Sequence, residues 1–268
     1  MKDVNIKELK KIQCDILFNV DNFCNEHQIK YSIACGTLLG AIRHKGYIPW
    51  DDDIDIYLLR EDYDKFISLF PETYKGKYKI VSWERNKKWS RTSAKVYDDT
   101  TILIEPTGDK IQIGINIDLF PIDQVPDDIK DWERYDKWRR FIQNFKYSLK
   151  DSPLFRNRPI WKTMLLFILR PAFFWLPSRF LCKYLDKLAR KYNDTPRNFV
   201  FENSLGMIVK NRFKKNIFDD IVYIPFENYS FKAFKNYDEY LRNAYGNYMQ
   251  LPPKEEQISH HKFQAYIK

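Results

Sequence analysis

The chain of 268 residues has little glycine, little cysteine and no long uninterrupted hydrophobic run. Its 8 glycines do not form a low-complexity tract, and we find no internal repeat and no recognised nucleic-acid-binding motif. No stretch reaches the roughly 18 uncharged apolar residues of a transmembrane helix. The N-terminus continues into charged helical sequence, so no signal peptide is expected. These absences predict a globular, cytoplasmic protein that does not bind nucleic acid.

Cysteine usage points to the same compartment. The four cysteines contain no C-x-x-C pair and show no regular spacing; they are Cys14, Cys24, Cys35 and Cys182. That pattern argues against a zinc ribbon or a disulfide framework and favours a reducing environment. We expect free thiols in the core.

The residues that are abundant suggest an anionic partner. The chain is 44% hydrophobic and 17% aromatic, and its formal net charge is +9. A basic surplus of this size is compatible with a nucleotide, an acidic glycan, nucleic acid or a membrane surface.

The most informative segment is the acidic run 50–56, which reads W-D-D-D-I-D-I. Asp53 and Asp55 alternate with isoleucines, which predicts a half-buried strand over 53–58 with both carboxylates on one face. Neighbouring carboxylates repel each other unless a cation lies between them, and Mg²⁺ is usually held by one or two carboxylates plus substrate phosphates. An acidic turn without a metal is the alternative, and it suits Asp51 and Asp52 better than the two strand residues.

Gly36 and Thr37 follow an apolar strand and begin a predicted helix. Backbone N–H groups at a helix N-terminus bind anions, and glycine permits close approach of a phosphate. A Gly-Thr pair means little alone, but followed by the acidic strand it predicts a phosphate site beside metal ligands.

A third carboxylate would complete the metal site, and Asp118 is the best candidate. It is an isolated acid in the apolar run 115–120, which is costly unless it is paired or coordinated. The alternative is a cap on the turn at Pro121. Asp123 is another possible third ligand, but its position beyond the proline suggests a turn residue.

Several cations could neutralise phosphate charge near such a site. Arg43 lies between Gly36 and the acidic run, while Arg91 and Lys95 lie around a later strand. Each of them fits a solvated surface position equally well. Trp50 could stack on a base or a ring, or pack in the core.

The pattern along the chain describes an α/β or α+β half through about residue 125 and a more helical remainder, and we expect the fold class to be α+β. Helices are expected over 6–27 and 38–43, from residue 61, and over 128–148, 160–192 and 237–245. Strands are expected over 30–34, 53–58, 78–83, 92–97, 101–105, 114–120, 206–210 and 221–223. Residues 1–125 are therefore interpreted as a catalytic core. Residues 126–268 are interpreted as a mainly helical, acceptor- or membrane-facing region that completes the site.

Residues 156–191 combine aromatic and aliphatic bulk with many cations. This is typical of an interfacial helix on anionic lipid, which would give a peripheral membrane contact. A buried helix pair with a basic outer face is the alternative. Arg170-Pro171 interrupts the apolar run, so we do not expect it to span a bilayer.

Five segments resemble the LicD family, whose bacterial members transfer phosphocholine to surface glycans and whose distant relatives include fukutin. They are residues 31–44, 46–56, 94–97, 116–121 and 240–249. The likeness covers nearly the whole chain and is weakest over 127–200. The ending, with His260 and His261, also looks like this family, although adjacent histidines rarely act as a pair.

The resemblance implies a nucleotidyltransferase-like mixed β-sheet core with flanking helices. Asp53, Asp55 and Asp118 would then be catalytic and hold Mg²⁺ or Mn²⁺. Gly36, Thr37, Arg43 and Lys95 would hold phosphate oxygens. The spacing from Gly36 to Asp53 is longer than in most of that superfold.

The resemblance also implies the substrates. It favours CDP-choline as donor and a surface glycan or lipid-linked glycan as acceptor, such as teichoic acid, lipopolysaccharide or capsule, with CMP as product at the inner face of the cell membrane. Glycerol, ribitol and ethanolamine phosphates are close alternatives. Nucleotidyl transfer with release of pyrophosphate, or a basic membrane- or nucleic-acid-binding module, would be different functions. The acceptor, the linkage, the number of metals and the oligomeric state are not encoded in any motif that we recognise.

Overall fold

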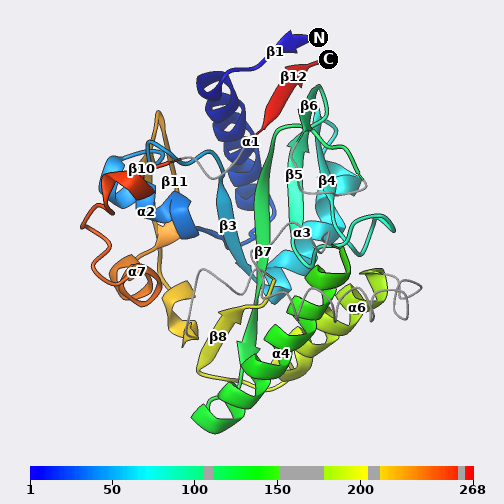
Figure 1. Cartoon of the computed structure of the whole chain (residues 1–268), viewed down its shortest axis with the longest axis vertical. Coiled ribbons are helices and arrows are strands. Elements are labelled where there is room, and N and C mark those ends of the chain that lie inside the picture. The colour runs from blue at the N-terminus through cyan, green and yellow to red at the C-terminus, as the bar shows by residue number, and fades with distance from the viewer. Residues whose placement is uncertain (105–110, 151–177, 205–211, 259–262) are drawn as a thin grey trace.

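The computed structural model of the chain describes residues 1–104, 111–150, 178–204, 212–258 and 263–268. A mixed β-sheet runs through the centre, and helices pack around it (Figure 1). This confirms the predicted α+β class.

The central sheet has seven strands. Five follow the order β2-β3-β7-β5-β4, and β8 pairs with β7 and in turn with β9. Their bounds are β2 Ser32–Ile33, β3 Asp55–Leu59, β4 Tyr78–Val81, β5 Ala94–Asp98, β7 Asn116–Val125, β8 Phe199–Glu202 and β9 Phe213–Lys214. Only β3 and β7 pair in parallel; the other pairs in this sheet are antiparallel.

The long strand β7 continues through Pro121, where we expected it to end. The Asp118 N–H donates to the Ile54 carbonyl on the β3 side. Since successive N–H groups alternate sides, the nitrogen of Pro121 points away from β3. On that side the pairing with β5 stops opposite Leu119, and the pairing with β8 starts at Ile122. The missing N–H therefore falls in a gap between two partners, where proline is tolerated.

Two smaller sheets complete the β-structure. The strands β1 (Lys2–Asp3), β12 (Gln264–Ile267) and β6 (Thr101–Ile104) form one, so both ends of the chain lie together (Figure 1). The hairpin β10–β11 (Ile221–Phe226, Tyr229–Phe234) is the other. Its last residue, Phe234, donates its N–H to the Ser32 hydroxyl in β2.

The helices are α1 Ile6–Glu26, α2 Cys35–His44, α3 Arg60–Thr73, α4 Ile129–Lys150, α6 Ser178–Ala189 and α7 Tyr237–Tyr245, with short 3₁₀ turns η1 Arg190–Tyr192, η2 Lys215–Phe218 and η3 Lys254–Glu256. Helix α1 begins with a capping box in which the Asn5 side chain accepts from the Glu8 N–H and the Glu8 side chain accepts from the Asn5 N–H. Such a cap satisfies N–H groups that have no partner within the helix.

The predicted helices over 6–27 and 237–245 are confirmed by α1 and α7. The strands β8, β11 and β12 were not expected, and the region beyond residue 126 therefore combines helices with short strands. The sheet also continues across residue 125, because β8 pairs with β7. The strand expected over 206–210 lies outside the described residues. In the described part of the chain, no helix is long and apolar enough to cross a membrane.

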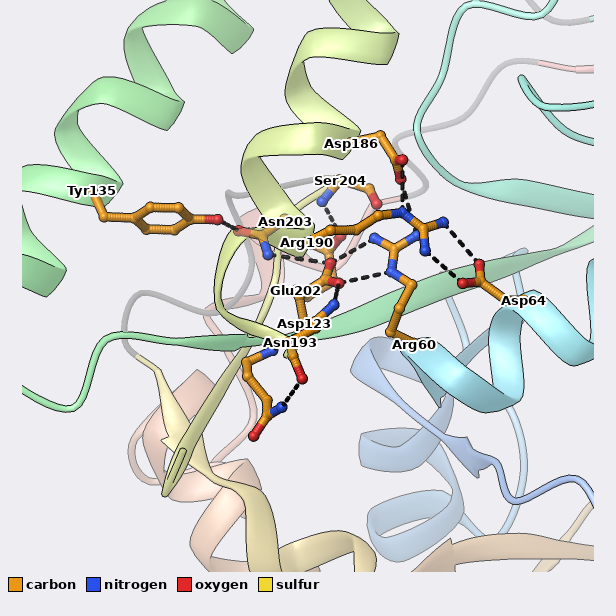
Figure 2. A network of polar contacts seen from close by, with 11 residues as sticks. Arg60, Asp64, Asp123, Tyr135, Asp186, Arg190, Asn193, Glu202, Asn203 and Ser204 are labelled. Carbon is orange, nitrogen blue, oxygen red and sulfur yellow. Dashed lines mark hydrogen bonds and ion pairs between the residues drawn. The ribbon is translucent and has the colours of Figure 1, made fainter. Parts of the chain in front are cut away.

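A network of ion pairs connects α3 and α6 to the C-terminal half of β7 (Figure 2). Arg60, at the start of α3, makes two hydrogen bonds to Asp123, at 2.7 and 2.6 Å, and one to Asp186 at 3.0 Å. Arg190 links Asp186 to Asp64. Asp123 is thus a buried residue within β7. Our interpretation of it as a turn residue was wrong, because β7 passes through the proline.

Candidate active site

Three charged residues form a row across adjacent strands. The parallel register of β3 and β7 sets Asp55 opposite Asp118, and the antiparallel register of β7 and β5 sets Asp118 opposite Lys95. Residues opposite each other in neighbouring strands project from the same face of a sheet. The fold therefore unites Asp55, Asp118 and Lys95, which are far apart in the sequence.

Lys95 is held by two side chains of β7. Its Nζ lies 2.6 Å from Asp118 Oδ2 and 2.7 Å from Asn116 Oδ1, and the residue is almost entirely buried. A buried ammonium group is costly unless it is paired, so these two contacts fix its position. The ion pair places one positive charge beside the two carboxylates of Asp118 and Asp55.

The pKa of Asp55 is strongly perturbed by its surroundings. Its burial, together with the nearby carboxylates of Asp53, Asp118 and Asp51, raises its pKa well above the usual range, against a smaller lowering by Lys95. Ionising it in the free protein is therefore unfavourable unless another positive charge approaches.

The start of α2 is tied to the start of β3. The Asp55 N–H donates to Thr37 Oγ1 at 2.9 Å, and the Ala34 N–H donates to the Asp55 carbonyl at 2.9 Å. Thr37 thus positions a carboxylate with its side chain. The first N–H groups of α2 have no partner within the helix and can bind an anion beside the acidic row.

Gly36 is in contact with the acidic loop. A Cβ at this position would lie only 2.4 Å from Asp51 Oδ2, so no other residue fits without displacing that carboxylate. The structure therefore brings Asp51 against the helix start, although the sequence suggested only a loop-shaping role for it.

The strand bounds differ from our expectation. β3 begins at Asp55, so Asp53 lies in the segment before the strand and not on its ladder. Ile54 and Ile56 are fully buried, and Asp55 is buried too, so β3 is covered on both faces and is not half-buried. Asp53 still acts on Asp55 through its charge.

The other predicted phosphate ligands have protein partners. Arg43 lies in the last turn of α2, and its Nη1 donates to the Tyr248 carbonyl at 2.9 Å. Trp50 is half-buried and meets the His44 ring edge-on, with 6.3 Å between centroids. Arg91 precedes β5 and lies over the Trp89 ring. His260 and His261 lie outside the described residues.

Sequence reasoning gave no role to α7, which borders the site. The Tyr240 hydroxyl accepts from the Cys35 N–H at 3.2 Å, at the point where α2 begins. Burial, the Cys35 thiol and the carboxylates of Asp55, Asp51 and Asp53 raise the pKa of Tyr245. The only available signal was the tyrosine-rich segment 240–249, which the resemblance included without explaining.

Cys35 is not suited to nucleophilic catalysis. It is fully buried, its thiol contacts the Tyr57 hydroxyl at 3.1 Å, and burial raises the pKa of the thiol well above its usual value. A thiol nucleophile needs a lowered pKa and some exposure. Cys35 is therefore not a candidate nucleophile.

The donor set suits a hard divalent cation. Within the described residues, no three His, Cys, Asp or Glu side chains are gathered closely enough to form a metal cage. Mg²⁺, however, takes one or two carboxylates and completes its shell with water and phosphate oxygens. Asp55 and Asp118 provide such a pair, and the carboxylates of Asp53 and Asp51 add negative charge beside Asp55. The residues present therefore fit the cation.

Comparison with known proteins agrees with this geometry. A family model described as "LicD/FKTN/FKRP, nucleotidyltransferase domain" matches residues 28–158. The lipopolysaccharide cholinephosphotransferase LicD of Haemophilus influenzae is 31% identical over 271 residues, covering 100% of both chains. The chain belongs to the LicD family. It is therefore an enzyme of the LicD transferase type, as the sequence motifs predicted.

Two uncharacterized proteins match shorter parts of the chain. One, from Rickettsia typhi, is 37% identical over 81 residues, covering 30% of this chain and 26% of that protein. The other, from Rickettsia prowazekii, is 47% identical over 60 residues, covering 22% of each chain. The names of these two proteins add no information on function.

The contact at Gly36 leads to a test of the phosphate site. We expect Gly36→Ala to raise the KM for the donor about tenfold or more, because the added methyl displaces Asp51 and crowds the approach to α2. The Tm should change by less than about 2 °C, since a flexible carboxylate can move. Steady-state kinetics and thermal unfolding measure the two quantities.

The control is Gly40→Ala in the same helix, whose Cβ would lie 2.4 Å from the backbone oxygen of Gly46. A backbone atom cannot move away cheaply, so this variant should lose stability. An unchanged KM for the donor in Gly36→Ala would show that the N-terminus of α2 does not bind the donor.

Proposed function

We propose that this enzyme is a metal-dependent phosphotransferase that moves phosphocholine from CDP-choline to a hydroxyl of a cell-surface glycan and releases CMP. The observation that carries the proposal is the row Asp55–Asp118–Lys95 beside the start of α2, in a chain that aligns end to end with a cholinephosphotransferase. The name of that relative supports phosphocholine and a lipopolysaccharide-type acceptor. The CDP donor and the metal are our extension.

In this proposal Asp55 and Asp118 hold Mg²⁺ or Mn²⁺, and Asp53, which we predicted as a third ligand, adds its negative charge beside Asp55. When bound, the cation would neutralise the diphosphate and stabilise the charge that develops in the transition state. The first turn of α2, with Gly36 and Thr37, receives phosphate oxygens on its N–H groups. Lys95, fixed by Asn116 and Asp118, supplies a further positive charge to the diphosphate.

The reaction is a substitution at the phosphorus that carries choline. The acceptor hydroxyl oxygen forms the new bond, and the bond from that phosphorus to the bridging oxygen breaks, so that CMP leaves with the electron pair. A carboxylate of the row accepts the hydroxyl proton, and we assign this to Asp118. Catalysis of phosphoryl transfer rests mainly on positioning and charge stabilisation, which a row of fixed charges on a rigid sheet can provide.

A product assay tests the proposed chemistry. With Mg²⁺ and a lipopolysaccharide acceptor, we expect CMP to appear in equal amount to choline phosphate on the glycan. Pyrophosphate released from CTP or ATP would instead show nucleotidyl transfer. Neither product, with intact folding, would favour a basic binding module.

A binding assay tests the identity of the donor. Ligands that bind the native state stabilise it and so raise the Tm. At a ligand concentration a hundred times Kd, the free energy of unfolding increases by about 2.7 kcal/mol. We expect CDP-choline with Mg²⁺ to raise the Tm more than CDP-glycerol, CDP-ribitol or CDP-ethanolamine. A larger shift with another CDP-alcohol would change the transferred group but keep the reaction class.

The acceptor proposal extends to the location of the enzyme. Teichoic acid or capsule repeats are alternatives to lipopolysaccharide, because the metal site does not read the acceptor. A lipid-linked acceptor would bring the protein to the cytoplasmic face of the membrane. Most of the segment 156–191, for which we predicted membrane contact, lies outside the described residues.

A further inference from the structure

The helix pair α4–α6 exposes a cluster of aromatic side chains that the core does not need. Trp138 and Phe141 on α4 are 46% and 58% exposed, and Phe180 and Tyr184 on α6 are 56% and 38% exposed. Single exposed hydrophobic residues are common, but a contiguous group of large ones marks an interaction site.

The four aromatics belong to one surface. The rings of Trp138 and Phe141 stack with centroids 5.5 Å apart, and Trp138 Nε1 donates to the Tyr184 hydroxyl at 3.0 Å. Phe180 precedes Tyr184 by one helical turn and therefore shares its face. The two helices lie side by side (Figure 1). We call this group the aromatic patch.

The inner face of the helix pair is already packed. Ile142, Leu181 and Leu185 form a buried cluster between α4 and α6, supported by the half-buried Phe145. The aromatic patch lies outside this cluster, so its exposure is not an opening of the core.

Cations continue the same helix faces beyond the aromatics. Lys130 and Arg134 precede Trp138 by two turns and one turn on α4, and Lys187 and Lys191 follow Tyr184 at three and seven residues along α6 and η1. On the described parts of α4, α6 and η1, seven exposed lysines and arginines stand against two exposed carboxylates, Asp131 and Glu133. The surface is thus aromatic at one end and strongly positive at the other.

From this arrangement we infer that the outer face of α4 and α6 is a docking surface for an anionic phospholipid membrane. Amphipathic tryptophan and tyrosine side chains enter the headgroup region of a bilayer, while flanking lysines and arginines bind its negative charge. The charge excess argues for a lipid surface over a second copy of this basic chain, whose net charge of +9 would oppose association. The inference stands whichever alcohol phosphate is transferred.

Vesicle co-sedimentation of the full chain tests the inference. We expect binding to phosphatidylcholine vesicles containing about one-third phosphatidylglycerol, weaker binding to pure phosphatidylcholine, and release by high salt. W138S/F141S should bind at least about tenfold more weakly, because two interfacial anchors are gone. K187E/K191E should bind about twentyfold more weakly at low salt, since each cation contributes severalfold.

Matched controls lie elsewhere on the surface. Phe18 is 44% exposed on α1, so F18S removes a similar aromatic away from the patch, and K7E/K11E reverses two exposed lysines of the same helix. Both controls should bind like the parent. If W138S/F141S folds poorly, Phe141→Ser alone, at the most exposed position, serves instead.

Three results would overturn the inference. One is a parent protein that does not bind the anionic vesicles. Another is vesicle binding that the patch variants do not weaken relative to the controls. The third is a dimer that depends on Trp138 and Phe141 in size-exclusion chromatography without vesicle binding, which would assign the patch to a second copy of the chain.

Discussion

Asp55→Asn is expected to reduce transfer about a thousandfold or more while raising the Tm by about 2–4 °C. Activity falls because the neutral amide removes one of the two facing carboxylates that would hold the cation on the diphosphate. Stability rises because burial and three neighbouring carboxylates raise the pKa of Asp55 in the folded state. A carboxylate whose pKa is raised in the folded state destabilises the fold at neutral pH, and asparagine removes that charge. CMP release and thermal unfolding without metal measure the two effects.

Asp98→Asn is the matched control for this prediction. Asp98 is also buried, at the end of β5, but hydrogen bonds from Lys77 and Thr100 outweigh the burial and lower its pKa. Its charge therefore stabilises the fold above the unfolded-state pKa, and its loss should lower the Tm with little effect on activity. If Asp55→Asn instead lowered the Tm, or kept full activity, the assignment of Asp55 to the metal site would be wrong.

Asp123→Asn is expected to destabilise the protein by about 3–5 kcal/mol, which corresponds to a fall in Tm on the order of 10 °C. The fully buried Asp123 accepts two hydrogen bonds from Arg60, and Asp186 accepts the third. The variant therefore leaves a buried guanidinium with half of its compensating charge. Asn193 also donates to Asp123 at 2.7 Å and would face an altered partner. Urea unfolding measures the loss.

An exposed ion pair provides the comparison for this second prediction. Glu72 and Arg85 lie 2.8 Å apart with their side chains 67% and 40% exposed, so Glu72→Gln should cost less than about 1 kcal/mol. A double-mutant cycle with Arg60→Met and Asp123→Leu should show strong coupling, since the pair is costly only when broken on one side. An effect of Asp123→Asn as small as that of Glu72→Gln would mean that the network is not compensated as the distances suggest.

Periodicity and residue type located several elements of the fold. The 3.6-residue apolar pattern predicted α1 and α7, and the strands β4, β5 and β6 were located to within about two residues. β8 and β12 escaped because each is four residues long and pairs with a strand far along the chain; Ala265, for example, pairs with Leu103. β11 pairs with the neighbouring β10 in a hairpin, and no pattern that we recognised marked it. Pro121 misled the reading of β7, since a proline is acceptable wherever its nitrogen faces no partner.

In the candidate site, too, single residues could be predicted from the sequence, whereas their arrangement in space could not. The isolated charges Asp118 and Lys95 could be noticed in apolar strands, but their alignment with Asp55 depends on sheet register, which no local pattern records. Asn116 belongs to the site through its hydrogen bond to Lys95, which no local pattern indicated. Thr37 was predicted as a phosphate ligand, but its hydrogen bond to the Asp55 N–H was not. Tyr245 was marked only by the tyrosine-rich segment around it. The guanidinium of Arg43 was visible in the sequence, but its hydrogen bond to the Tyr248 carbonyl could not be foreseen.

The hydroxyl of Tyr240 on the Cys35 N–H has a consequence for dividing this enzyme into parts. The stretch recognised by the family model, 28–158, contains Asp55, Asp118 and Lys95 but neither α7, nor α1, nor the strand β8 that extends β7. Excised alone, it would keep every carboxylate of the row yet lose the group that supports the N-terminus of α2 and one of the three strand partners of β7. We therefore expect the stretch 28–158 not to work as an independent module.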